Sequence, residues 1–116
     1  MPPAYTYFAD LMGEVEVPAA GILTRTLYED PQVKLVVFGF DAGQELSEHT
    51  ASVPAVLHFL RGEARLTLGK DSMETHAGAW VRLPAGLPHS VRATTALVML
   101  LLLLKSASGE GGAAGR

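Results

Sequence analysis

Two glycine-bounded blocks separated by a turn signal constrain the fold of this chain more than any other feature. The first block spans residues 43–62, the second spans residues 78–89, and each carries a histidine. The segment between them has Gly69-Lys70-Asp71 at its centre, a sequence typical of a tight turn. Glycines that punctuate short β-rich runs in this way predict a small antiparallel barrel.

The rest of the chain supports this prediction. Pro31 in the segment 29–32 marks a further turn. Runs rich in β-branched, aromatic or alternating apolar residues predict strands over residues 22–28, 33–40, 46–51, 55–60, 64–68, 73–76, 80–83 and 97–104. A length of 116 residues suits one domain. We expect an N-terminal arm over residues 1–20, a barrel over residues 21–105 and a flexible tail rich in Gly, Ala and Ser over residues 106–116.

The first block resembles the first motif of the cupin family. That motif reads Gly, five residues, His, one residue, His, three or four residues, Glu, six residues, Gly. Gly43, His49 and Gly62 fall on its first glycine, first histidine and last glycine. Ala51 stands at the second histidine position and Ala55 at the glutamate position.

The second block resembles the second cupin motif, which reads Gly, five residues, Pro, one residue, Gly, two residues, His, three residues, Asn. Gly78, Pro84, Gly86 and His89 match it, and Ala93 stands in place of Asn. The resemblance implies an all-β fold: a single-domain, cupin-type antiparallel β-barrel, or jelly roll. It also implies a homodimer, which would cover the apolar excess of residues 38–40 and 96–104.

The metal ligands of the family are incompletely present. Three histidines and one glutamate usually hold the metal, and only His49 and His89 match them. This pair implies at most one divalent transition metal, which could be Zn, Ni, Mn, Fe or Cu. The alternative is that both histidines form hydrogen bonds inside a partly polar cavity that holds no metal.

Strand parity indicates which other side chains line the interior. If His49 points inward, the predicted ligand cavity is also lined by Ala51, Ala55, Leu57 and Phe59. His58 then points outward, unless a bulge at Pro54 reverses the parity and makes it a third metal ligand.

Charged side chains near these blocks are further candidates for the cavity. Glu45 shares the face of His49 by parity but lies about 13 Å away along an extended strand. Arg82 could point into the cavity and bind a carboxylate or phosphate. Alternatively, Arg82 reaches the rim or forms an ion pair between subunits.

Composition excludes several functional classes. The net charge of −3 and the absence of a basic run argue against binding to nucleic acid or to an anionic membrane. The chain has no Cys, so it has neither disulfides nor thiolate metal sites. The apolar run of residues 96–104 is too short to span a membrane, and the N-terminus lacks the pattern of a signal peptide, so we expect a cytoplasmic protein.

Two functional hypotheses remain open from the sequence. The first is a small-molecule-binding cupin with a sensor, carrier or accessory role, in which metal binding is weak or absent. The alternative is a metal-dependent cupin enzyme, with an oxygenase or isomerase-like activity that uses His49 and His89.

Overall fold

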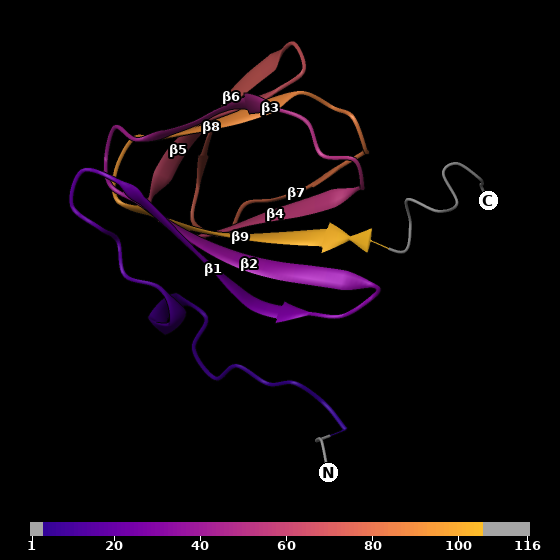
Figure 1. The fold of residues 1–116 in the computed structure, drawn as a ribbon. Coiled ribbons are helices and arrows are strands. Elements are labelled where there is room, and N and C mark those ends of the chain that lie inside the picture. Colours follow the sequence, from indigo (N-terminus) through magenta and orange to yellow (C-terminus); the bar gives the residue numbers. More distant parts are fainter. Residues whose placement is uncertain (1–3, 106–116) are drawn as a thin grey trace.

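The computed structural model describes residues 4–105, which form two antiparallel β-sheets facing each other (Figure 1). The expected tail over residues 106–116 lies outside the described residues. The elements are the 3-10 turn η1 (Met12–Glu14) and the strands β1 (Ile22–Glu29), β2 (Val33–Phe40), β3 (Glu45–His49), β4 (Ala55–Arg61), β5 (Glu63–Leu68), β6 (Asp71–His76), β7 (Trp80–Leu83), β8 (His89–Ala93) and β9 (Leu97–Leu104). The prediction of an all-β antiparallel jelly roll is confirmed.

The chain crosses repeatedly between the two sheets. The five-stranded sheet has the order β1-β2-β9-β4-β7, and the four-stranded sheet has the order β3-β8-β5-β6. Because β3 and β8 lie in one sheet while β4 and β7 lie in the other, each glycine-bounded block contributes to both sheets. The interior between the sheets is therefore lined by both blocks.

The core lies between the inner faces of the sheets. It contains side chains from both sheets, because alternate residues of each strand point inward. Its buried members include Phe38, Phe40, Leu57, Phe59, Leu66, Leu83, Val91, Leu97 and Met99.

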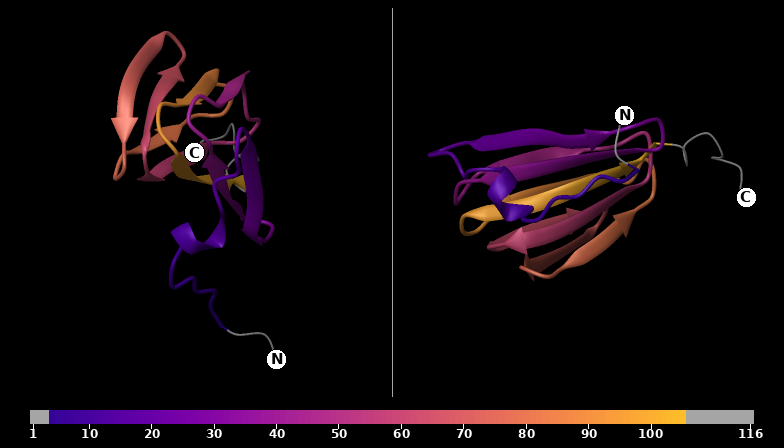
Figure 2. Two further views of the ribbon diagram at one scale, coloured as in Figure 1. Left: turned by 90° about the vertical axis from the view of Figure 1, so that its left-hand side faces the viewer. Right: turned by 90° about the horizontal axis from the view of Figure 1, so that it is seen from below.

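A second, smaller apolar cluster lies on the outer face of the five-stranded sheet. Val37 of β2 and Val98 and Leu100 of β9 are buried there. They pack against partly buried side chains that include Leu11, Val15 and Val17 of the N-terminal segment. Figure 2 (right) shows this segment crossing the outer face of the sheet. The apolar run of β9 is thus covered on its outer side partly by the chain itself.

Within residues 4–105, no helix has the length and apolar character needed to cross a membrane.

The glycines of both blocks have the backbone conformation that explains their spacing. Gly43, Gly62, Gly78 and Gly86 all have a positive φ, between 84° and 98°. At Gly62 the backbone also runs close to another segment, because a Cβ atom there would fall on the carbonyl oxygen of Ala96. At Gly43 no atom would lie near an added Cβ.

This difference yields a matched pair of substitutions. Gly43→Ala should lower the free energy of unfolding by about 1–2 kcal/mol, the cost of a left-handed backbone for an L-residue. Gly62→Ala should lower it by about 2–5 kcal/mol, because overlap with Ala96 adds to that cost. Urea unfolding of both variants measures the two values, and equal losses would contradict the close approach at Gly62.

The hairpin between β1 and β2 is held by one carboxylate. Asp30 accepts hydrogen bonds from the Tyr28 hydroxyl at 2.7 Å and from the backbone N–H groups of Gln32 and Val33 at 2.7 and 2.9 Å. The Tyr28 hydroxyl, followed by the two N–H groups, lowers the pKa of Asp30 below its ordinary value of 3.8. These bonds stabilise the ionised carboxylate, so folding favours the charged form.

Asp30→Ala should therefore lower the thermal unfolding midpoint at neutral pH. A lowered folded pKa means that the contribution of Asp30 is complete above pH 3.8 and is lost as the pH falls through the folded pKa. The difference in midpoint between wild type and Asp30→Ala should shrink as the pH falls below 3.8. Asp71→Ala, at another exposed turn, is the control, and a pH-independent difference for Asp30→Ala would contradict this origin.

Candidate functional site

Two histidines from different parts of the chain lie next to each other at one end of the four-stranded sheet. His49 ends β3, His89 begins β8, and the two residues are paired in register. Their ring centroids are 4.2 Å apart, with an angle of 55° between the ring planes. His89 is only 5% exposed, whereas His49 is exposed. The pair therefore joins the interior of the barrel to its rim.

A β-bulge in β3 gives His49 this position. Leu46 lies opposite the buried Val91, and His49 lies opposite His89, so three steps along β3 match two steps along β8. The extra residue reverses the alternation of side chains, and Leu46 and His49 share the inner face. Glu45, which parity placed on the face of His49, instead lies opposite Arg92 and forms an exposed ion pair with it at 3.7 Å.

Both imidazoles are oriented by backbone carbonyl groups. Nδ1 of His49 lies 2.8 Å from the carbonyl oxygen of Ser47, and Nδ1 of His89 lies 2.9 Å from that of Leu87. A carbonyl oxygen only accepts, so Nδ1 is the donor in each ring. In a neutral imidazole this leaves Nε2 as the acceptor, and neither Nε2 has a hydrogen-bond partner within residues 4–105. The same atom is a good ligand for transition metals.

The predicted apolar lining divides into buried and loop positions. Ala55, Leu57 and Phe59 of β4 are buried, at 1%, 2% and 1% exposure. Ala51 is half-buried in the connection after β3, where its carbonyl oxygen accepts a hydrogen bond from the N–H of Gly86 at 2.8 Å. This bond ties the first block directly to the second.

Two other predicted candidates lie elsewhere. Arg82 is exposed and lies opposite Val56, on the face of the sheet that points away from Ala55 and Leu57, so it does not enter the cavity. His58 also lies on the outer face, between Trp80 of β7 and Leu100 of β9. The irregularity of β4 falls between Phe59 and Arg61, not at Pro54, and so leaves His58 outside.

The described residues supply only part of a metal site. In residues 4–105, no group of three or more His, Cys, Asp or Glu side chains is close enough to hold a metal ion. Catalytic zinc sites have three protein ligands and an open position. His49 and His89 provide two, so the donor set does not fit a complete catalytic metal centre.

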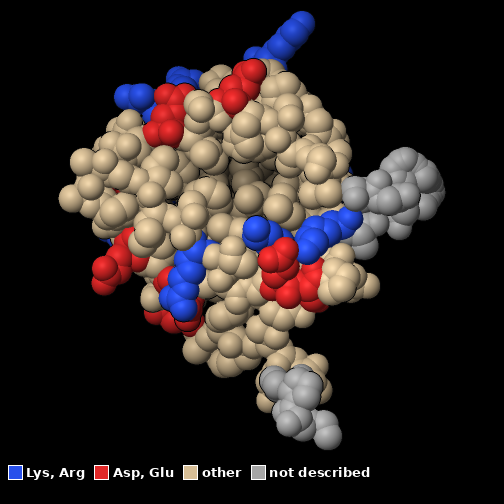
Figure 3. All heavy atoms as spheres, viewed as in Figure 1, with Lys and Arg blue, Asp and Glu red and all other residues tan. Residues whose placement is uncertain are grey.

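The surface around the barrel mouth is largely uncharged. Figure 3 shows a hollow near the centre of this face, between the two sheets, with the Lys, Arg, Asp and Glu side chains placed around it.

Among the cavities that were not anticipated from the sequence, two have mainly apolar linings. The first, of about 150 Å³, lies inside the barrel and shares only Phe59 with the predicted lining. The alternation of apolar and polar residues in the strand 64–68 indicated that Leu66 points inward. The other side chains that line the cavity come mainly from β6 and β7, and only the topology shows that these strands lie close to Leu66.

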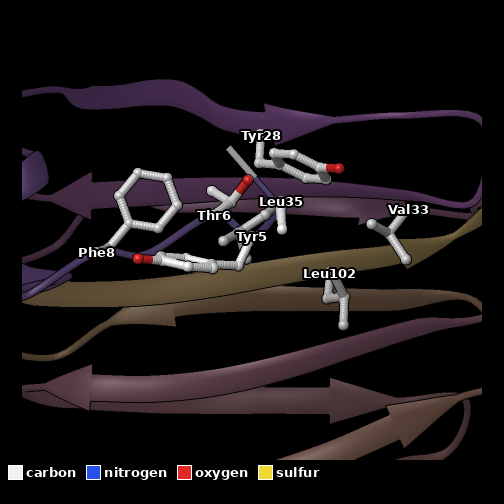
Figure 4. A pocket seen from close by; sticks show the side chains of 8 residues that line it. Tyr5, Thr6, Phe8, Tyr28, Val33, Leu35 and Leu102 are labelled. Carbon is white, nitrogen blue, oxygen red and sulfur yellow. The ribbon is translucent and has the colours of Figure 1, made fainter. Parts of the chain in front are cut away.

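The second cavity lies on the outer face of the five-stranded sheet, beneath the N-terminal arm (Figure 4). Its volume is about 450 Å³, and it is lined by Ala4, Tyr5, Thr6, Phe8, Tyr28, Val33, Leu35 and Leu102. Tyr5, Thr6 and Phe8 gather at one end of it, and Val33 and Leu102 lie toward the other. Tyr5 is 75% exposed, so the arm covers this part of the sheet incompletely.

Comparison with known proteins identifies similar sequences and structures. A family model described as the cupin domain matches residues 36–104. A conserved protein of unknown function from Streptococcus pyogenes is 31% identical in sequence, covers 90% of each chain and superposes with a TM-score of 0.77. An RmlC-like cupin from Desulfovibrio desulfuricans is 26% identical over 87% of this chain and 98% of its own, with a TM-score of 0.78. A cupin superfamily protein from Desulfitobacterium hafniense is 21% identical over 90% of this chain and 94% of its own, also with a TM-score of 0.78. None of the curated proteins matches the sequence.

Proposed function

The chain belongs to the cupin superfamily, and we propose that its barrel binds a small organic molecule in a sensor, carrier or accessory role. The observation that carries this proposal is the pair His49 and His89, whose Nε2 atoms have no partner in residues 4–105. Fold alone assigns no function, so the proposal rests on the chemistry of this pair and its surroundings.

The two imidazoles suit the polar end of a ligand. Each ring is fixed by the hydrogen bond at Nδ1, so Nε2 is presented in a defined direction without further ordering. A neutral imidazole accepts a hydrogen bond from a hydroxyl group through Nε2, and a charged imidazole donates one from Nε2 to a carboxylate. We therefore assign a hydroxyl or carboxyl group to this end of the ligand.

The remaining interior suits an apolar body. Leu57 and Phe59 are buried in the core of the barrel, and Ala51 and Ala55 replace the larger polar residues of the family motif. Both alanines are small and carry no polar side-chain atom, so neither adds a metal ligand to the pair. Binding pockets of this kind are mainly apolar, with a few polar groups that orient the ligand.

The alternative is a metal-dependent cupin enzyme, with an oxygenase or isomerase-like activity. The free Nε2 atoms of His49 and His89 favour it, because they could hold one divalent Zn, Ni, Mn, Fe or Cu ion. A bound ion of this kind would supply Lewis-acid or redox chemistry. With two protein ligands, binding would be weak, and for this reason we prefer the metal-independent proposal.

Metal analysis separates the two proposals. Protein purified without a His tag should stay free of metal after incubation with Zn²⁺, Ni²⁺, Cu²⁺, Mn²⁺ or Fe²⁺ and dialysis, because two imidazoles retain these ions poorly. Elemental analysis measures the content, with His49→Ala and His89→Ala as controls. Stoichiometric metal that disappears in both variants would instead support the enzyme.

Ligand binding provides the second test. Hexanoate, a small apolar acid, should shift the imidazole NMR signals of His49 and His89 in the wild-type protein. His89→Ala should weaken hexanoate binding by about threefold to tenfold, because one charge-assisted or neutral hydrogen bond is lost. His58→Ala, on the outer face, is the matched control and should bind hexanoate as the wild type does. Equal affinities of the two variants would contradict the assignment of the polar end.

We also propose that two copies of the chain associate through the outer face of the five-stranded sheet. Leu35, Leu102 and Val56 form a row across β2, β9 and β4 on this face, and all three are only half-buried in the single chain. Tyr5 and Tyr7 of the adjacent arm are exposed. A row of half-buried apolar side chains beside exposed aromatic rings is typical of a self-association surface.

A charge in this row should prevent association. Leu102→Glu should convert a dimer to a monomer in light scattering after size-exclusion chromatography, because the carboxylate would be buried without a partner. Thr94→Glu, in an exposed loop, is the control and should remain dimeric. A wild-type protein that is monomeric at high concentration would overturn the proposal.

A further inference from the structure

The cavity inside the barrel lies at the seam between the two sheets, next to the turn that connects β6 to β7. It has a volume of about 150 Å³ and is lined by Phe59, Leu66, Met73, Thr75, Ala79, Trp80 and Val81. β6 is the last strand of the four-stranded sheet and β7 the last strand of the five-stranded sheet, and the two are not paired with each other. The turn between them is bonded to β4 instead, through the N–H of Phe59 to the carbonyl of Ala79 at 2.9 Å and the N–H of Gly78 to the carbonyl of Phe59 at 2.8 Å, so the cavity lies between two strand edges that are joined only by this turn.

The inner part of this cavity is closed and apolar. Phe59 of β4 and Leu66 of β5 are 1% and 3% exposed and belong to the main core. Val81 and Ala79 pack against the same core from β7 and the turn before it. No charged side chain lines the cavity. An ionic ligand would lose its hydration here without compensation, so the cavity selects an uncharged one.

One polar side chain interrupts the apolar lining. Thr75 lies opposite Ala64 in the β5–β6 pair and is 7% exposed. Its hydroxyl forms no hydrogen bond with any other group in the described part of the chain. No buried side-chain polar atom within residues 4–105 lacks a partner, so solvent reaches this hydroxyl, and a single hydrogen-bonding group on a ligand can take the place of that solvent.

Two larger side chains flank the mouth of the cavity. Met73 on β6 is 38% exposed and Trp80 on β7 is 60% exposed, although both are large and apolar. Trp80 lies opposite the outward-facing His58, so its ring lies on the outer side of the mouth. Met73 and Phe59 supply a thioether and an aromatic ring, groups that interact well with the face or edge of an aromatic ring.

We infer that this seam pocket is a ligand site for a small, uncharged, single-ring aromatic molecule with one hydroxyl group, of the size of phenol. A cavity of 150 Å³ lined by apolar side chains is large enough for benzene. The ring lies against Phe59 and Leu66, and its hydroxyl group forms a hydrogen bond with Thr75. Neither His49 nor His89 lines the pocket, so this site does not depend on the function proposed for the histidine pair.

Phenol and benzene are the probes that test the pocket and its hydroxyl separately. The wild-type protein should bind phenol saturably with a dissociation constant of about 1 mM or tighter. Emission from Trp80, the only tryptophan in the chain, and the methyl NMR signal of Met73 should both change during the titration. Absence of saturable binding would overturn the inference.

Two variants locate the ligand. Thr75→Val keeps the shape of the side chain, so it should weaken phenol binding by about threefold to tenfold and leave benzene binding unchanged. Ala79→Leu should fill the cavity and weaken both ligands by at least about tenfold. Ala42→Leu makes the same change at an exposed turn and should bind both ligands as the wild type does.

The remaining outcomes are also decisive. Unchanged phenol affinity in Thr75→Val would contradict the proposed hydrogen bond between phenol and Thr75. If Ala79→Leu does not fold, Thr75→Val still tests the site. Equal affinities of Ala79→Leu and Ala42→Leu would overturn the location. His49→Ala and His89→Ala should bind phenol as the wild type does, and loss of binding in either would move the ligand to the histidine pair.

Discussion

The burial of β9 on both faces is the constraint on which the rest of the structure depends. This strand lies at the centre of the five-stranded sheet, between β2 and β4. Leu97 and Met99 belong to the core inside the barrel, whereas Val98 and Leu100 belong to the outer cluster beneath the N-terminal segment. An uninterrupted apolar sequence is stable only where both faces are covered. The N-terminal segment is therefore part of the packing that holds the barrel together.

Three local features of the backbone position the histidine pair on this framework. Glycines with positive φ turn the chain between the sheets, a hydrogen bond from Gly86 to Ala51 fixes one block against the other, and the bulge in β3 turns His49 inward. Each of these features is a property of the backbone and does not involve the histidine side chains. The arrangement of the pair can therefore persist while the neighbouring metal-ligand positions are occupied by Ala51 and Ala55.

The sequence predicted the features that depend on local pattern. Glycine spacing predicted the turns, and alternation placed Leu57 and Phe59 inside and His58 outside. It did not predict the bulge between Leu46 and His49, because no residue there requires one, and the parity of Glu45 was wrong for that reason. The exposure of Arg82 follows from its pairing with Val56, which only the strand register reveals. The seam pocket likewise depends on which strands end each sheet.

Both candidate sites lie where hydrogen-bonded pairing between strands stops. His49 is on β3 and Thr75 is on β6, the two edge strands of the four-stranded sheet. Between them, β8 and β5 are paired on both sides and carry the buried Val91 and Leu66. Edge strands make fewer constraining contacts than central ones, so their side chains can change with less effect on the core. The polar pair lies at one edge and the apolar pocket at the other, so the two proposed sites are separated by the packed strands at the centre of the sheet.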